Sequence, residues 1–166
     1  MTQFQTQMAQ KVLGGLPPGK PPTKVQFQSH STKIGKQFAG LCSEMLEGQG
    51  WRLQGPTKIQ ELGVHVDQVG YTKNGTKTFF QFNGSFNGET PGLKRFNSFK
   101  QALAAIYLVK QFDKSPVVVL TSHKPNTGTA GDKAITITKK NGLVRDVLGV
   151  FDREDIKSLE NILNNE

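Results

Sequence analysis

The chain has 166 residues, with 21 Lys and Arg against 13 Asp and Glu, and therefore a formal net charge of +8. This length suits one domain, and the sequence has neither the run of about 18 apolar residues that a membrane helix needs nor the apolar stretch of a secretory signal. The single Cys42 excludes an intramolecular disulfide framework and a multi-cysteine zinc site, so we expect a cytoplasmic protein whose basic charge favours a polyanionic partner such as nucleic acid.

The first 30 residues are rich in Gln, Pro and Gly, and we expect them to form a flexible basic arm ahead of one domain at 31–166. Four prolines between Gly14 and Pro22 remove backbone donors and restrict their neighbours, which excludes a helix or a sheet ladder there. The stretch also contains the pattern G-x-x-x-x-G-K. Pro21 follows it where a phosphate loop needs Ser or Thr, and no hydrophobic strand precedes it, so we reject a phosphate loop.

The first half of the domain is predicted to be a helix followed by three strands. Apolar residues between Ile34 and Leu46 recur at helical spacing. The strands are expected at 51–55, 63–71 and 77–83. A turn at Pro56 is predicted to end the first of them. Asn74–Gly75 is a strong two-residue hairpin signal, so the second and third strands are expected to pair in antiparallel.

The second half is predicted to alternate between helices and strands. Asn97 is a plausible N-cap for a long helix, and the β-branched run 116–120 is typical of a strand buried on both faces. After a polar loop at 121–132, the alternation in 134–138 predicts another strand, and a short strand is expected within 143–151. A last helix follows Asp152. The fold class is therefore α/β, with a mixed central sheet flanked by helices.

Three polar side chains fall on the predicted hairpin. Asp67 lies on its first arm, and Gln81 and Asn83 lie on its second arm. Residues 81 and 83 share one face of their strand because side chains alternate. A carboxylate facing two polar groups suits a hard divalent cation such as Mg²⁺, which prefers oxygen ligands and keeps several waters.

At these residues the chain resembles the PD-(D/E)XK nuclease superfamily, most closely its Mrr-like restriction endonuclease branch. The segment Gly63–Asp67 looks like that branch's Asp motif, and Phe80–Gly84 looks like its Gln-x-Lys strand. The resemblance covers about residues 34–140 and implies a restriction-endonuclease-like αβββαβ core. It also implies Mg²⁺- or Mn²⁺-dependent hydrolysis of DNA, with Asp67 and Gln81 in the site and with Glu44 on the first helix as a further metal ligand.

The chain departs from this motif at one position. Asn83 stands where the family places the Lys that positions the attacking water and offsets charge on the phosphate. Members of the superfamily sometimes supply that Lys from the following helix, and Lys94, Arg95 or Lys100 would serve here. The alternative is a fold that has kept its nucleic-acid surface and lost its chemistry.

Each candidate also has a purely structural interpretation. Asp67 would then end a strand, Gln81 would be an exposed amide, and Glu44 would be a solvated helix acid. His65 shares strand parity with Asp67, which leaves a supporting role open for it.

Further basic residues follow the hairpin and are predicted to contact phosphates: Arg95, Lys100, Lys110, Lys124, Lys139 and Lys140. The first functional hypothesis is a metal-dependent DNA endonuclease. The second is a catalytically silent nucleic-acid-binding module or a subunit of a DNA-processing complex, and the third is a protein–protein adaptor. RNA stays open as a partner. Cutting both strands of a duplex usually takes two active sites, which favours a homodimer.

Overall fold

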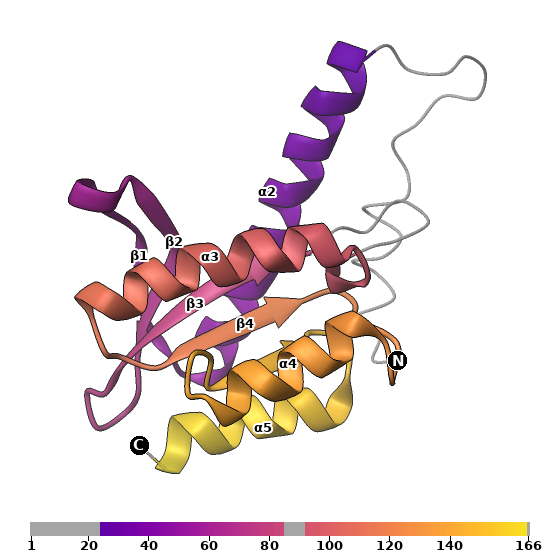
Figure 1. Cartoon of the computed structure of the whole chain (residues 1–166). Helices are drawn as coiled ribbons and strands as arrows, with labels where there is room; N and C mark the ends of the chain where they lie inside the picture. The colour runs from indigo at the N-terminus through magenta and orange to yellow at the C-terminus, as the bar shows by residue number, and fades with distance from the viewer. Residues whose placement is uncertain (1–23, 85–91, 166) are drawn as a thin grey trace.

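The computed structural model describes residues 24–84 and 92–165, with side chains described from residue 35 onward. It is an α/β fold with one mixed sheet of five strands and helices on both faces (Figure 1). In chain order the elements are α2 (Lys24–Gln49), β1 (Arg52–Ile59), the 3₁₀ turn η1 (Gln60–Leu62), β2 (Val64–Tyr71), β3 (Lys77–Asn83), the 3₁₀ turn η2 (Gly92–Lys94), α3 (Phe96–Phe112), β4 (Val117–Thr121), α4 (Ala130–Lys140), β5 (Asp146–Gly149) and α5 (Arg153–Asn165).

The start of the predicted arm, residues 1–23, lies outside the described residues, and so does the G-x-x-x-x-G-K pattern. Residues 24–30 of the arm are helical, because α2 begins at Lys24.

The strands lie in the order β1-β2-β3-β4-β5. The pairs β1–β2 and β2–β3 are antiparallel, whereas β3–β4 and β4–β5 are parallel. Helix α3 connects β3 to β4, and α4 connects β4 to β5, so the carboxyl ends of these three strands lie at one edge of the sheet (Figure 1). The predicted α/β class, mixed sheet and flanking helices are confirmed, and the element order is the predicted one through β4.

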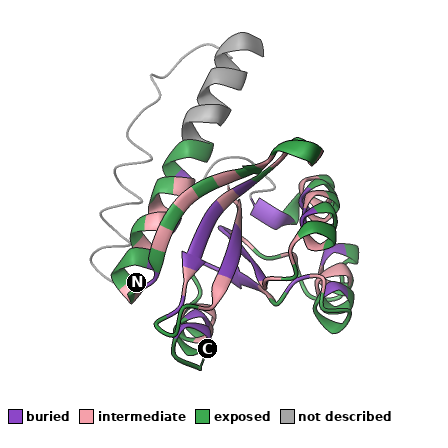
Figure 2. Ribbon diagram, turned by 90° about the vertical axis from the view of Figure 1, so that its left-hand side faces the viewer, coloured by how far each residue is buried: buried purple, intermediate pink, exposed green. Residues whose placement is uncertain are grey.

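Two apolar cores lie on opposite faces of the sheet, which Figure 2 shows as a buried layer between helices. Phe80 packs with residues of α2 and α5, and its ring meets Trp51 edge to face at 4.9 Å. Its strand neighbour Phe79 belongs to the other core, with residues of α3 and the α4–β5 segment. Strand β4 is buried along its whole length, as its β-branched sequence predicts.

The prediction of a strand at 134–138 is wrong, because these residues belong to helix α4. Alternating Ile and Thr favour strands only weakly, and the surrounding chain overrides that preference. The hydroxyl of Thr138 donates back to the carbonyl of Ala134 at 2.8 Å, so the β-branched residue is accommodated within the helix.

The ends of α4 explain why this segment is helical. The side chain of Thr129 caps its N-terminus by accepting from the N–H of Asp132 at 3.4 Å. At the other end, the N–H of Gly142 donates to Lys139 and that of Leu143 donates to Thr138, both at 3.0 Å. This is a Schellman motif, with Gly142 at a φ of +69°. The loop predicted over 121–132 therefore ends at residue 129.

Two further boundaries differ from the predictions. Strand β1 continues past Pro56 to Ile59, because register shifts on either side of Gly55 accommodate the proline on an edge strand. Helix α3 begins at Phe96 with Arg95 in the N-cap position, two residues earlier than the predicted cap at Asn97. The predicted short strand after residue 143 and the helix after Asp152 are present as β5 and α5.

Candidate functional site

The arms of the β2–β3 hairpin separate beside Asp67. Their pairing runs from Tyr71–Lys77 to Gln68–Phe80, which is the last pair of the ladder. Just beyond it, Oδ2 of Asp67 accepts the backbone N–H of Phe82 at 2.7 Å and Nε2 of Gln81 at 2.5 Å. The carboxylate therefore closes the end of the hairpin, and the structure brings the predicted site residues Asp67 and Gln81 into direct contact.

The Asp67 carboxylate lies in an unfavourable place for a charge. Burial raises its pKa above the usual value of 3.8, although the hydrogen bonds from Phe82 and Gln81 and the charge of His65 act in the opposite direction. Burial also raises the pKa of the Cys42 thiol on α2, and the Asp67 carboxylate adds to that rise. A half-buried carboxylate with a raised pKa and specific partners is typical of a functional site.

This environment gives a prediction for folding stability in metal-free buffer. Because its pKa is raised, Asp67 binds its proton more tightly in the folded state than in the unfolded state. The free energy of unfolding therefore falls as pH rises from about 3.8 to beyond the raised pKa of Asp67. In Asp67→Asn, one amide oxygen still accepts both hydrogen bonds, and the charge is gone. We expect this variant to melt above wild type at pH 7 and at the same temperature near pH 3, in thermal scans with EDTA. An Asp67→Asn variant that melts below wild type at pH 7 would contradict the cost of the buried charge.

Asn83 makes its hydrogen bonds to α3 and β4 and not to the Asp67–Gln81 pair. Its side-chain amide donates to the carbonyl of Ser98 on α3 at 3.3 Å. Its backbone carbonyl accepts the hydroxyl of Thr121 at the end of β4, at 2.7 Å. Asn83 therefore ties the carboxyl end of β3 to α3 and β4.

The three cations predicted to replace the motif Lys lie around the start of α3. Lys94 ends η2, and its charge adds to burial in lowering the pKa of His123. Arg95 is exposed. The ammonium of Lys100 lies 4.8 Å from the ring centroid of Phe96. The basic side chain whose charge acts on Asp67 is His65.

The sequence indicates His65 only weakly. Its one signal is the spacing of two residues from Asp67, which places both side chains on the same side of an extended strand.

Glu44 lies apart from this pair. It is exposed on α2, two residues after the buried Cys42, and two residues correspond to about 200° around a helix. The side of α2 that carries Cys42 faces Asp67, whose charge raises the pKa of the Cys42 thiol. Glu44 therefore lies on the side of the helix that faces away from Asp67. Within the described residues, no three His, Cys, Asp or Glu side chains gather in a way that would hold a metal ion.

The donor set at the hairpin is therefore small. Asp67 offers Oδ1, because Oδ2 already accepts two hydrogen bonds, and Gln81 offers its amide oxygen. Mg²⁺ is commonly bound through one or two carboxylates while it keeps several waters, so one carboxylate and one amide oxygen fit this ion and would bind it weakly.

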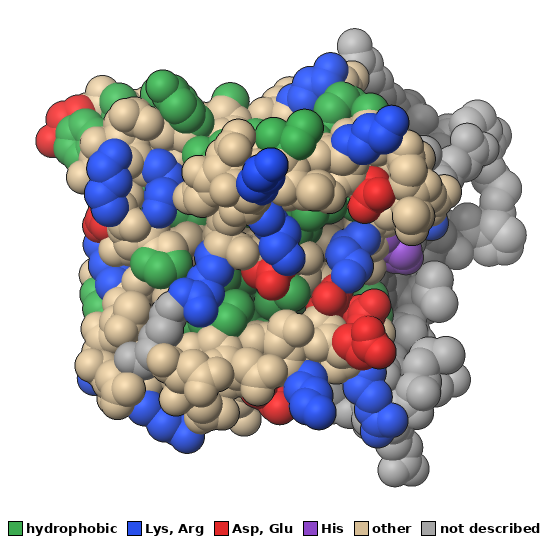
Figure 3. All heavy atoms as spheres, turned by 60° about the horizontal axis from the view of Figure 1, so that its bottom comes forward, with side chains coloured by type: hydrophobic (Ala, Val, Ile, Leu, Met, Phe, Trp, Pro, Cys, Tyr) green, Lys and Arg blue, Asp and Glu red, His purple; other side chains and the backbone are tan. Residues whose placement is uncertain are grey.

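Several of the predicted phosphate-binding lysines have partners within the fold. Lys124 pairs with Asp155 at 2.6 Å, and Lys139 pairs with Asp146 at 2.5 Å. Lys110 donates to the backbone carbonyls of Lys114 and Ser115 at 2.8 and 3.0 Å. The remaining members of the predicted set, Arg95, Lys100 and Lys140, are exposed. Figure 3 shows basic side chains spread over the face that it presents.

Residues 92–93 pack closely against residues 121–123 at the carboxyl end of β4, and this contact, the Gly92 junction, fixes the backbone just before Lys94 and α3. The N–H of Leu93 donates to the carbonyl of His123 at 2.9 Å. Gly92 has a φ of +59°, and a Cβ atom there would lie 2.8 Å from the backbone nitrogen of His123 and from the hydroxyls of Thr121 and Ser122. Only glycine fits this position without displacing its neighbours.

Gly92→Ala is therefore expected to lower the free energy of unfolding by about 2–4 kcal/mol, from left-handed backbone strain and overpacking together. Gly142→Ala is the matched control, because Gly142 has a φ of +69° but open space around it. That variant is expected to lose only about 1–2 kcal/mol. Urea denaturation measures both, and equal losses would exclude a steric role for the junction.

Comparisons with known proteins give this chain no relatives: no family model, no curated protein and no solved structure matches it. Within the described part of the chain, no helix has the length and apolar character to cross a membrane.

Proposed function

We propose that this chain is a metal-dependent DNA endonuclease with a restriction-endonuclease-like fold, in the manner of the PD-(D/E)XK superfamily. The observation that carries the proposal is the half-buried Asp67 carboxylate, held by Gln81 and the Phe82 N–H where the hairpin arms separate. An acid in that position is costly to the fold in the absence of a cation, since its pKa is raised by burial. A divalent cation would remove that cost.

Asp67 and Gln81 would hold the ion through the oxygens that the carboxylate and the amide offer. When bound, Mg²⁺ or Mn²⁺ supplies Lewis-acid activation of a water and of the phosphodiester. The chain itself fixes the carboxylate through the Phe82 N–H. Asn83, anchored on Ser98, shapes the strand end where the family has its Lys.

The DNA backbone would lie along the start of α3. Lys94, Arg95 and Lys100 follow one another there and are exposed, so their charges are available to phosphates. Lys94 is the first of the three and directly follows the backbone contact between Leu93 and His123, and we assign it to the role of the missing Lys. Contacts of this kind position a duplex without reading its sequence.

A second candidate function is a catalytically silent nucleic-acid-binding module. The observation that favours it is the bond between the Asn83 amide and Ser98, because an uncharged group occupies the position of the motif Lys. In this case the basic residues around α3 would bind nucleic acid, and the Asp67–Gln81 pair would only close the hairpin.

A cleavage assay distinguishes the two functions. Wild type and Asp67→Asn are incubated with supercoiled plasmid in Mg²⁺ or Mn²⁺, beside branched and single-stranded DNA and RNA, and with EDTA as the metal-free control. The endonuclease proposal predicts nicking by wild type that disappears in EDTA and in Asp67→Asn. If every substrate stays intact while the plasmid shifts on a low-salt gel, the silent binding module is the function. An intact plasmid with no shift would contradict both.

A further inference from the structure

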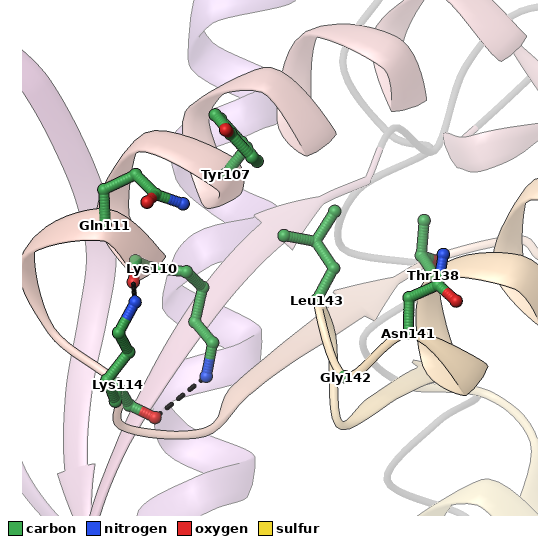
Figure 4. A pocket seen from close by; sticks show the side chains of 8 residues that line it. All are labelled: Tyr107, Lys110, Gln111, Lys114, Thr138, Asn141, Gly142 and Leu143. Carbon is green, nitrogen blue, oxygen red and sulfur yellow. Dashed lines mark hydrogen bonds between the residues drawn. The ribbon is translucent and has the colours of Figure 1, made fainter.

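A hollow of about 380 Å³ lies between the C-terminal ends of α3 and α4, and none of the functions above uses it. Its lining residues are Tyr107, Lys110, Gln111, Lys114, Thr138, Asn141, Gly142 and Leu143. Figure 4 shows Tyr107 and Gln111 on α3 at one side, Thr138 and Asn141 at the other, and Leu143 between them. Both helices run back from the carboxyl edge of the parallel strands, so the hollow lies at the opposite edge from Asn83 and Lys94 (Figure 1).

The walls of the hollow combine an exposed aromatic ring with amide side chains. Tyr107 is 56% exposed although it is a large aromatic residue, and Leu143 adds an apolar surface beside it. Gln111 and Asn141 each carry an amide with both a donor and an acceptor end. A ring for stacking beside two amides is the combination that proteins use to hold an unpaired nucleobase.

The charge of the hollow is positive. Lys110 and Lys114 line it, and no carboxylate does. Both ammonium groups donate to backbone carbonyls at the end of α3: Lys110 to residues 114 and 115, and Lys114 to residue 110. An ammonium has three donors, so one remains on Lys110 and two on Lys114. These donors and charges suit a phosphate group.

We propose that this hollow binds one nucleotide unit of a single-stranded nucleic acid. The base stacks on Tyr107 beside Leu143, its edge meets the amides of Gln111 and Asn141, and the adjoining phosphates lie toward Lys110 and Lys114. Single-stranded nucleic acids bind elsewhere by the same combination of aromatic stacking and positive charge. The site does not depend on the endonuclease proposal, because it needs neither Asp67 nor a metal.

An acidic peptide is the competing partner for a positive hollow. The two amides and the ring of Tyr107 favour a nucleotide, because a peptide of Asp and Glu would use the lysines and leave the ring and the amides unengaged. Ile137, next to Thr138 on α4, adds an exposed apolar side chain at 57% exposure.

The test is fluorescence anisotropy of a labelled single-stranded 20-mer of mixed sequence in EDTA, so that cleavage plays no part. Tyr107→Ala is expected to weaken binding about tenfold or more, from the lost stacking on one base. Phe112→Ala is the matched control, because Phe112 is 57% exposed on the same helix and does not line the hollow. Its affinity is expected to stay within about twofold of wild type.

A second pair of variants tests the charge of the hollow. Gln111→Glu and Asn161→Asp each convert an exposed amide to a carboxylate, but only Gln111 lines the hollow, because Asn161 lies on α5, on the opposite face of the sheet from α3. The proposal predicts the larger loss for Gln111→Glu. Equal losses within either pair of variants would overturn it.

Two competitor ligands test the identity of the occupant. Tyr107-dependent binding of a nucleoside monophosphate as tight as that of the 20-mer would assign the hollow to a free nucleotide and overturn the single-strand proposal. Binding of a poly-glutamate peptide that depends on Lys114 alone, with no effect of Tyr107→Ala on the 20-mer, would assign it to an acidic peptide and overturn the proposal as well.

Discussion

On the endonuclease proposal, an Asn83→Lys variant is expected to cleave supercoiled plasmid about 100-fold faster than wild type in Mg²⁺, since removing or supplying one well-placed charged or hydrogen-bonding group changes such rates by about 10²–10³. Residues 81 and 83 share a strand face, so a Lys at 83 would lie on the same side as Gln81. The variant would lose the hydrogen bond from the Asn83 amide to Ser98, a modest cost of about 1 kcal/mol. Initial rates of nicking measure the effect.

Asn83→Gln is the control for this variant, because it lengthens the side chain without adding charge, and its rate is expected to stay near that of wild type. A well-folded Asn83→Lys with an unchanged rate would show that position 83 does not limit cleavage. If Lys94→Ala then abolished wild-type cleavage, the positive charge would be assigned to Lys94, which directly follows the Gly92 junction.

Gln81→Glu is expected to make the stability of the fold depend strongly on divalent cations. In metal-free buffer the variant loses the hydrogen bond from Gln81 to Asp67 and places a second carboxylate against the first, at a cost of about 1–3 kcal/mol. Bound Mg²⁺ or Mn²⁺ offsets this repulsion, and a second carboxylate strengthens the site for the ion. Melting temperatures in EDTA and in millimolar Mg²⁺ or Mn²⁺ measure both effects.

The control for Gln81→Glu is Gln101→Glu, an exposed position on α3 where the same change should leave the melting temperature unchanged with or without metal. Gln81→Glu should also regain stability in acid, because protonation of either carboxylate removes the repulsion. If metal raised the melting temperatures of Gln81→Glu and wild type equally, the hairpin end would not be a cation site.

The contact between Asp67 and Gln81 could be predicted from the sequence because it depends on local geometry. The Asn74–Gly75 signal predicts an antiparallel hairpin, which brings residue 67 close to residues 81 and 82. A two-residue turn would pair residue 67 with residue 82, whereas the observed ladder begins at Tyr71–Lys77 after the loop 72–76 and brings residue 67 level with residue 81. Hydrophobic periodicity likewise predicts α2, α3 and the buried β4, since each has one dominant pattern over many residues.

The remaining features depend on residues far apart in the sequence, which no local pattern links. The bond from Asn83 to Ser98 and the pairing of Lys124 with Asp155 require the positions of helices around the sheet. In α4, the alternation of Ile and Thr predicts a strand, whereas the caps at Thr129 and Gly142 favour a helix. Both caps are visible in the sequence, and in the folded chain they outweigh the alternation.

The central claim is that the end of the hairpin is a divalent-cation site, and it is tested most directly by nuclear magnetic resonance with substoichiometric Mn²⁺. Bound Mn²⁺ broadens the signals of backbone amides close to it. We expect selective broadening around Asp67, Gln81 and Phe82 in wild type and none there in Asp67→Asn. Broadening centred on another acidic group, such as Asp155, or the same broadening in both proteins, would contradict the claim.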